Sequence, residues 1–291
     1  IAPALHLQPG DRVKTRTVDS RGFDRDGRPY APRSNPLTGP FFIDGAMPGD
    51  TLVVHLDRIR TNRGTAFQSS QIAGQALEPD YLRETAAAAP AGYANWKIDA
   101  AAGTATLAEP GSRMSGYSVK LSPMLGCIGV APPRDEVYRA THLGPYGGNL
   151  DSPEVREGTT LYLPVFHPGA LLFLGDGHAA QGDGEVPGQG LETSMDVEFR
   201  LDLIPCRATA PPRLARADAI MIMGVGGSLD AAMRNATTQM SRWLAETYGL
   251  TQQDIAALLG TAIQFQIAEV VDPEFNVVAK ISKSDLAKLR R

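Results

Sequence analysis

The chain has 291 residues, of which 43% are hydrophobic and 21% charged, as is ordinary for a globular protein with one sizeable core or two smaller ones. The formal net charge of −4 predicts no basic surface for nucleic acid or anionic lipid, and no window approaches the roughly 18 apolar residues of a membrane span. We therefore expect no nucleic-acid partner and no membrane partner. The chain begins with Ile1, with neither a signal peptide nor a Met start, which leaves open that residues precede it.

The two cysteines provide neither a disulfide framework nor a CxxC pair. We expect Cys127 and Cys206 to be buried, reduced thiols in a cytoplasmic protein. The 30 glycines and 22 prolines, in a chain with few long helical patterns, favour a β-rich fold with many turns.

The first part of the chain predicts strands and turns. Over residues 1–60 a Pro-Gly-Asp turn twice precedes a run of alternating apolar residues, whereas residues 20–40 are polar and predict a loop. Residues 61–118 are harder to interpret, with short strands at NWKIDA and TATLAEP and an exposed helix over PDYLRETAAAAP.

A strand is predicted over residues 195–203, because every second side chain there is apolar. It follows a charged, glycine-rich segment, GDGHAAQGDGE at 175–185, which two apolar runs precede. We predict this segment to be a loop held between strands, where rigid walls position reactive side chains.

The composition shifts after Arg207. RADAIMIMGVG predicts a buried strand, and a helix with Ser228 as N-cap and Gly249 at its end follows. Thr251 and Asp254 form a capping-box variant that begins a second helix, before further strands and a short tail helix.

These patterns predict an α+β fold that is predominantly β. We expect a sandwich- or barrel-like body over residues 1–207 that carries the active-site loops, and a small α/β subdomain over residues 208–291 packed on it.

The best candidate for a metal site lies in the glycine-rich segment, with Asp176, His178, Asp183 and Glu185. One imidazole and several carboxylates suit zinc, manganese or calcium, so the donor set does not identify the metal. The alternative is a surface turn with solvated carboxylates.

A second candidate segment is Gly147–Asp151, in which Asn149 offers an amide for an oxyanion and Asp151 a base or ligand. The alternative there is an ordinary Asx turn. Glu192 lies where the predicted strand begins and is a candidate general base or metal ligand. The alternative interpretation is that Glu192 is simply an exposed carboxylate without a role.

Nucleophilic catalysis finds little support in the sequence. There is no GxSxG elbow, Ser228 is better explained as a helix cap, and Cys127 has no base or cation near it in the sequence. GVGG at 224–227 completes no phosphate-binding motif, so we expect no nucleotide cofactor.

Several motifs together resemble the acetamidase/formamidase family, from about Val13 to the C-terminus. They are SNPLTGPFFIDGAMPGDTLVVHL, PMLGCIGVAPP, GGNLD, GDGHAAQGDGE, LETSMDVEFRL, MGVGGSLDAAMRNATTQM and AEVVDP, in this order. The PYGG segment that runs into GGNLD departs from the His- or Gly-rich lead-in of many members, so the resemblance leaves the substrate preference open.

The resemblance implies hydrolysis of short amides, or opening of a small lactam, by a β-rich protein that forms a homodimer or higher homo-oligomer. It also implies a divalent metal, for which we expect zinc. The matched motifs carry over six site residues: Asn149, Asp151, Asp176, His178, Asp183 and Glu185.

The individual roles are our inference. We expect Asp176, His178 and Glu185 to bind the metal. Asp183 or Asp151 would act as the general base, Asn149 or amides of the glycine-rich loop would hold the oxyanion, and Glu192 would complete the catalytic set. The competing hypothesis is a β-rich metal-binding protein without catalytic activity.

Overall fold

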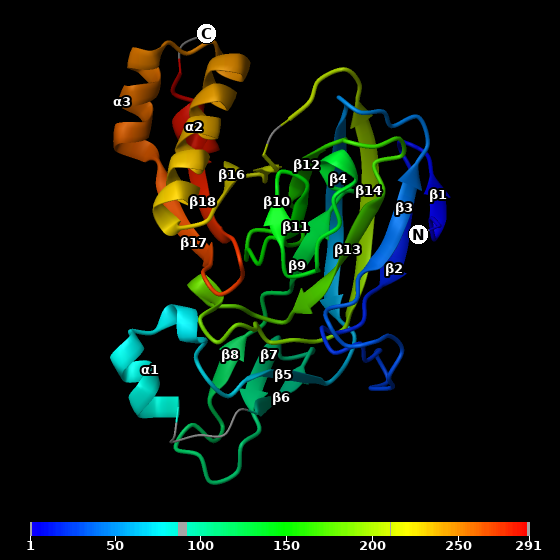
Figure 1. The fold of residues 1–291 in the computed structure, drawn as a ribbon, viewed down its shortest axis with the longest axis vertical. Helices are drawn as coiled ribbons and strands as arrows, with labels where there is room; N and C mark the ends of the chain where they lie inside the picture. Colours follow the sequence, from blue (N-terminus) through cyan, green and yellow to red (C-terminus); the bar gives the residue numbers. More distant parts are fainter. Residues whose placement is uncertain (1, 87–91, 210, 290–291) are drawn as a thin grey trace.

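The computed structural model describes residues 2–86, 92–209 and 211–289. Its strands form three sheets (Figure 1). In spatial order the first sheet contains β1 (Leu5–Leu7), β3 (Thr38–Ile43), β13 (Leu172–His178), β9 (Met124–Gly129), β11 (Gly147–Asn149) and β10 (Leu143–Gly144).

The second sheet is the largest and joins strands from both ends of the chain. In spatial order it contains β17 (Gln264–Glu269), β18 (Phe275–Ser282), β16 (Ala219–Gly226), β15 (Arg213–Ala215), β12 (Thr160–Pro164), β4 (Thr51–Thr61), β14 (Met195–Ile204) and β2 (Arg12–Arg16). The third sheet contains β5 (Thr65–Ser69), β6 (Tyr93–Asp99), β7 (Thr104–Leu107) and β8 (Ser118–Lys120).

The two larger sheets share one hydrophobic core, because the strands that face it alternate apolar and polar side chains. In β14 the side chains of Met195, Val197, Phe199 and Leu201 are buried, which confirms the alternation predicted for this strand. Phe199 meets Phe41 of the first sheet edge-on, with ring centroids 5.8 Å apart.

Four helices complete the described part of the chain. They are α1 (Pro79–Ala86), α2 (Leu229–Tyr248), α3 (Gln252–Ala262) and α4 (Lys283–Leu286). In Figure 1, α2 and α3 lie beside β16 and β18 at the end of the molecule away from the small third sheet. Of these helices, none combines the length and apolar character needed to cross a membrane.

Helix α2 begins and ends as predicted. The Ser228 hydroxyl accepts a hydrogen bond from the Ala231 N–H, and Gly249 ends the helix in the left-handed region with φ of 65°. The helix packs closely on β16, since a Cβ on Gly224 would lie 2.7 Å from the Ala236 nitrogen. The capping box of Thr251 and Asp254 is likewise present in α3.

The structure refines several other expectations. The sheets form no closed barrel, and the second sheet is continuous across the predicted boundary after Arg207, because β15 pairs with β12. The division into two domains stays a prediction. Helix α1 confirms the first part of the predicted helix, and residues 87–90 of that prediction lie outside the described residues.

Three local expectations were wrong. Asp176 and His178 belong to β13 rather than to a loop, because the strand continues through its glycines. Gly147–Asn149 is strand β11 and not an Asx turn. Cys206 is exposed, whereas Cys127 is buried as expected, and both are free thiols.

Candidate functional site

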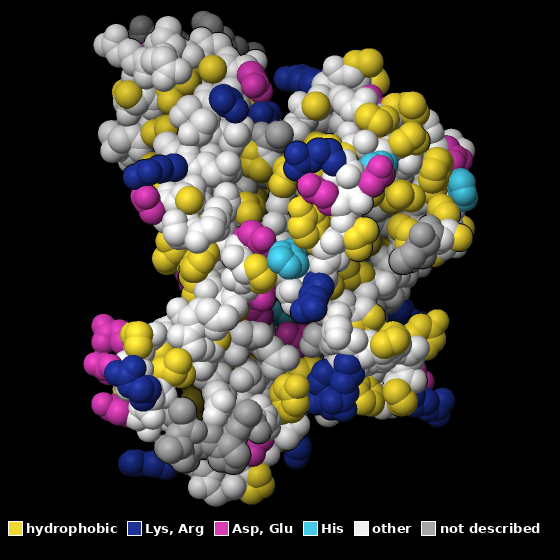
Figure 2. Space-filling view, in the orientation of Figure 1, with side chains coloured by type: hydrophobic (Ala, Val, Ile, Leu, Met, Phe, Trp, Pro, Cys, Tyr) yellow, Lys and Arg dark blue, Asp and Glu magenta, His cyan; other side chains and the backbone are white. Residues whose placement is uncertain are grey.

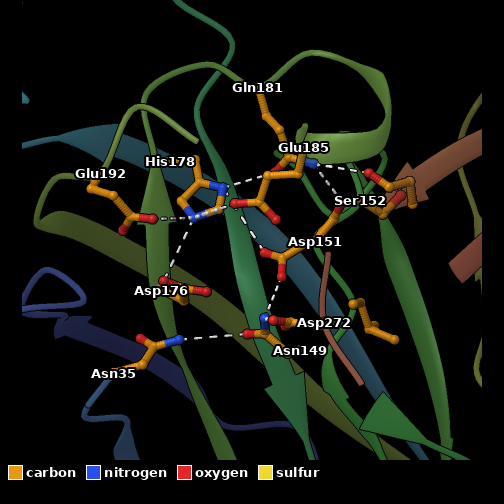
Figure 3. Close-up of polar contacts among 12 residues, drawn as sticks. Asn35, Asn149, Asp151, Ser152, Asp176, His178, Gln181, Glu185, Glu192 and Asp272 are labelled. Carbon is orange, nitrogen blue, oxygen red and sulfur yellow. Dashed lines mark hydrogen bonds and ion pairs between the residues drawn. The ribbon is translucent and has the colours of Figure 1, made fainter. Parts of the chain in front are cut away.

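Five side chains from separate parts of the chain converge on one buried place (Figure 3). Asp176 and His178 come from the end of β13, and Asp151 follows β11. Glu185 ends the 3₁₀ turn Asp183–Glu185, and Glu192 forms an isolated bridge with His178. All five are at most 5% exposed.

His178 is the centre of the group. Its Nε2 lies 3.2 Å from Glu192 Oε1, 3.5 Å from Asp176 Oδ1 and 4.0 Å from Glu185 Oε1. Its Nδ1 lies 4.0 Å from Asp151 Oδ1. Each carboxylate is therefore within ion-pair distance of the imidazole, and we call these five residues the acidic cluster.

The close approach of two carboxylates depends on Gly126 in β9. A Cβ on this residue would lie 2.6 Å from Asp176 Oδ2 and closer still to Asp151 Oδ1. Any side chain here would therefore push the two carboxylates apart. Gly126, in the LGCIGV segment, is a glycine because only a residue without a side chain leaves room for both carboxylates.

Three of the four carboxylates stand on strained backbone. Asp151, Asp176 and Glu185 have φ of 36°, 57° and 47°, in a region that side-chain-bearing residues rarely adopt. Such strain costs of the order of 1–3 kcal/mol per residue and concentrates at functional sites. Its clustering here indicates that the position of these carboxylates serves more than packing.

Gln181 determines which nitrogen of His178 carries a proton. Its Nε2 donates to the backbone oxygens of Asp151 at 2.6 Å and Ala268 at 3.2 Å, so its Oε1 faces His178 Nδ1 at 2.8 Å. Because Oε1 can only accept, Nδ1 must donate. In the neutral imidazole, Nε2 then presents its lone pair towards Glu192 and Asp176.

Burial and mutual repulsion shift the pKa values of the cluster. Burial raises the pKa of Asp151, Glu185 and Glu192, and the neighbouring carboxylates raise them further. Burial alone would lower the pKa of His178, but Glu192 and Asp176 outweigh it and raise that pKa. One imidazolium balances only one of four carboxylate charges, so the cluster favours a further cation, whether protons or a metal ion.

The residues present fit a divalent metal ion. Asp151 Oδ1, Asp176 Oδ1, His178 Nε2 and Glu192 Oε2 are buried without a hydrogen-bond partner among the described residues. Buried polar atoms are nearly always paired, and an ion is one explanation for exceptions. Two overlapping triads, Asp151–Asp176–His178 and His178–Glu185–Glu192, bring their donor atoms within 4.8 Å of one another.

Asn149 binds two carboxylates rather than leaving its amide free. Its Nδ2 donates to Asp151 Oδ2 and, at 2.6 Å, to Asp272 Oδ2, while Asn35 Nδ2 lies 3.5 Å from its Oδ1. With both N–H groups engaged, Asn149 orients Asp151, which differs from the oxyanion role expected from the sequence. Burial raises the pKa of Asp272 to about 6.

The structure thus brings together six of the seven site residues proposed from the sequence and leaves out Asp183. This carboxylate is exposed and accepts a hydrogen bond from Gln266 Nε2 at 2.6 Å. Sequence reasoning missed Gln181 and Asp272. Gln181 lies in the GDGHAAQGDGE motif and Asp272 in AEVVDP. A single amide or carboxylate after a strand has no characteristic spacing that would mark it as a site residue.

The molecule is hollowed at its centre on the face shown in Figure 2, where acidic side chains are visible below the surface.

The family model for the acetamidase/formamidase family matches residues 138–283, a span of half the chain. This span contains the whole acidic cluster, together with Asn149, Gln181 and Asp272.

Individual relatives agree with this match. A formamidase of Methylophilus methylotrophus is 27% identical over 182 residues, which cover 55% of this chain and 42% of that enzyme. Two solved structures are similar along nearly the whole chain. The acetamidase of Yersinia enterocolitica has a TM-score of 0.84 and 28% identity, covering 99% of this chain and 88% of its own. The acetamidase of Bacillus halodurans has a TM-score of 0.82 and 29% identity, covering 100% and 95%.

Proposed function

Because the chain belongs to the acetamidase/formamidase family, a family of amidases, we propose that it hydrolyses the C–N bond of amides to a carboxylate and ammonia. The observation that carries the proposal is the acidic cluster, a buried imidazole ringed by four carboxylates with unpaired donor atoms. The matched segment spans 42% of the Methylophilus formamidase, so the activity is inferred from the site as well as from the match.

We propose that the cluster holds a divalent ion, most simply zinc, at His178 Nε2 together with Asp176, Glu185 and Glu192. One nitrogen and several oxygen donors suit zinc, with manganese and calcium as alternatives. When bound, such an ion polarises a carbonyl oxygen and makes water nucleophilic near neutral pH.

Asp151 is the proposed general base. It accepts a proton from the attacking water and returns one to the departing nitrogen, so that amide and water become carboxylate and ammonia. Burial and the carboxylates of Glu185 and Asp176 raise its pKa, which suits a group that must both take up and release a proton. Asn149 and Gln181 hold this acid in place, through its side chain and its backbone oxygen respectively.

Two further expectations remain proposals. We propose a cytoplasmic location, which the exposed free thiol of Cys206 supports, since exposed thiols persist in reducing compartments. We also propose a homo-oligomer, as the sequence resemblance implies, which sedimentation of the purified chain would test.

Ammonia release from formamide, acetamide and a γ-lactam tests the activity. It should be measured on protein as purified, after chelation, and after zinc is returned. Loss of turnover on chelation and its return with zinc supports the proposal. Turnover that persists in protein shown to be metal-free would remove the metal from the mechanism, and metal binding without turnover of any amide would favour the non-catalytic hypothesis.

A further inference from the structure

A cavity of about 590 Å³ lies next to Asn149, the residue that donates a hydrogen bond to Asp151 of the acidic cluster. Three of its lining residues connect the two. The Asn35 side chain lies against the Asn149 amide, Gly148 precedes that residue, and Cys127 pairs with it across β9 and β11. The cavity is therefore one residue away from the amide that orients Asp151.

The rest of the lining is mainly apolar. It includes Leu37, Pro40, Ala131, Pro132, Leu171 and Phe173, while the acidic and basic side chains of the lining are Glu136, Arg139 and His142. At about 30 Å³ per molecule the cavity has the volume of roughly twenty waters, whereas formamide and acetamide are only about two or three waters in size. A site for such small, polar amides needs neither this volume nor this lining.

Two stacked tyrosines line the same cavity. The rings of Tyr138 and Tyr146 are nearly parallel, at 6°, with centroids 5.6 Å apart. Tyr138 is 44% exposed, so one edge of the stack is open to solvent, whereas Tyr146 is only 4% exposed. The Tyr146 ring fits because Gly144 and Gly148 have no side chains, since a Cβ on either would lie within 2.9 Å of it.

The hydroxyl of Tyr146, whose side chain lines the cavity, is an unpaired donor. It is buried and has no hydrogen-bond partner among the described residues. A buried hydroxyl without a partner is costly, and a bound ligand is one way to satisfy it. Small-molecule sites typically combine an apolar lining with a few such polar groups.

We propose that this cavity binds the acyl substituent of the substrate, and that the substrate is a primary amide with an apolar, ring-containing acyl group. This inference rests on the proposed amidase activity. The acyl side is assigned because departing ammonia carries no substituent, so a large apolar volume beside the reacting groups must serve the other half of the amide. A planar ring packs on the aromatic lining, and a polar atom on that ring pairs with Tyr146.

A series of primary amides tests the assignment: acetamide, butyramide, phenylacetamide and 4-methoxyphenylacetamide, with ammonia release as the readout. Each buried methylene-sized group should raise kcat/KM about fourfold, so phenylacetamide should exceed acetamide by well over tenfold. Acetanilide, which carries its ring on nitrogen, should gain nothing. A flat series, or a gain only with acetanilide, overturns the inference.

Two substitutions in the cavity should change this preference. Ala131→Leu reduces the free volume, and Tyr138→Ala removes an exposed part of the aromatic wall. Each should lower the ratio of kcat/KM for phenylacetamide to that for acetamide by about tenfold, mainly through KM, because burying one apolar group more or less changes affinity by this amount. Tyr81→Ala is the matched control, since Tyr81 is similarly exposed, at 54%, on α1. An unchanged ratio in both folded cavity variants would contradict the inference.

Direct binding separates this inference from the proposed function. Saturation-transfer NMR on the wild-type protein should detect phenylacetamide through its ring protons, with weaker transfer in Ala131→Leu. Turnover of acetamide without ring binding leaves the amidase proposal standing and overturns the cavity assignment. Ring binding without turnover of any amide shows a ring-binding cavity but overturns the amidase proposal, and with it the assignment of the cavity to an acyl group.

Discussion

Oε1 of Gln181 lies 2.8 Å from Nδ1 of His178, while both N–H groups of the same amide point to backbone oxygens. The reversed amide would place its oxygen, which can only accept, against two backbone carbonyl oxygens that can also only accept. The orientation is therefore determined by the backbone of Asp151 and Ala268, and it directs Nε2 of His178 to the carboxylates.

Gln181→Leu should weaken metal binding by about 10- to 100-fold, the usual effect of losing the partner of a metal-binding histidine. The variant leaves Nδ1–H of His178 unpaired and releases the ring from its fixed orientation. Competition against a chromophoric chelator measures the affinity directly and requires no substrate. Gln189→Leu is the control, since Gln189 is a half-buried glutamine eight residues further along the chain. Equal affinities in the two variants would show that Gln181 does not position the imidazole.

Gly126→Ala should abolish metal binding and reduce activity by at least about 10²-fold, because the added methyl group occupies the space between Asp151 and Asp176. Gly182→Ala is the matched control inside the site segment. A Cβ on Gly182 meets nothing within 4 Å, and its φ of −86° suits any residue. Metal content and kcat of the two purified variants provide the comparison, and an active Gly126→Ala enzyme would refute the packing argument.

Glu269 predicts a pH dependence of stability. Its side chain is buried and accepts hydrogen bonds from the Val271 and Asp272 N–H groups, while its Oε1 has no partner among the described residues. Burial raises its pKa from 4.5 to about 8. Between pH 4.5 and 8 the folded state therefore holds a proton on Glu269 that the unfolded state has lost. The stability that the protonated Glu269 contributes is complete below pH 4.5 and is lost as the pH rises to 8.

Glu269→Gln should flatten this dependence. The amide mimics the protonated acid at every pH, so the variant should gain stability over the wild type between pH 4.5 and 8, by a few kcal/mol at most at about 1.4 kcal/mol per pKa unit. Urea unfolding of metal-free protein at several pH values measures the difference. Parallel pH profiles for variant and wild type would contradict the expected ionisation.

The sequence correctly predicted those strands and helix ends whose local residue pattern agrees with their environment in the folded protein. The alternation of β14 and the caps of α2 and α3 were visible because burial on one face and unpaired N–H groups at a helix start require particular residue types. Asp176 and His178 were misplaced on a loop because glycines between them suggest a turn. In the structure such glycines allow side chains and backbone from neighbouring segments to approach the strand, as Met195 does at Gly177.

The site could be predicted only as a set of residues. Spacing placed Asp183 and Glu185 together, but the turn between them directs Glu185 inwards and leaves Asp183 exposed. The contribution of Asp272 depends on β17 and β18 lying beside the cluster, a long-range arrangement that no local pattern contains. Resemblance to a family identified the motifs, and the fold decided which side chains within them meet.

Asp151→Asn and Asp183→Asn should separate the two candidate general bases. Asp151 is buried against His178 and Asn149, so its amide variant should lose about 10²- to 10⁴-fold in kcat, the usual contribution of a positioned base. Asp183 contacts Gln266 at the surface, and its variant should retain most of the activity. Steady-state kinetics on a turned-over amide measures both, with metal content determined to exclude loss of the ion. The reverse ranking would return the catalytic role to Asp183, because a surface hydrogen bond to Gln266 can open when substrate binds.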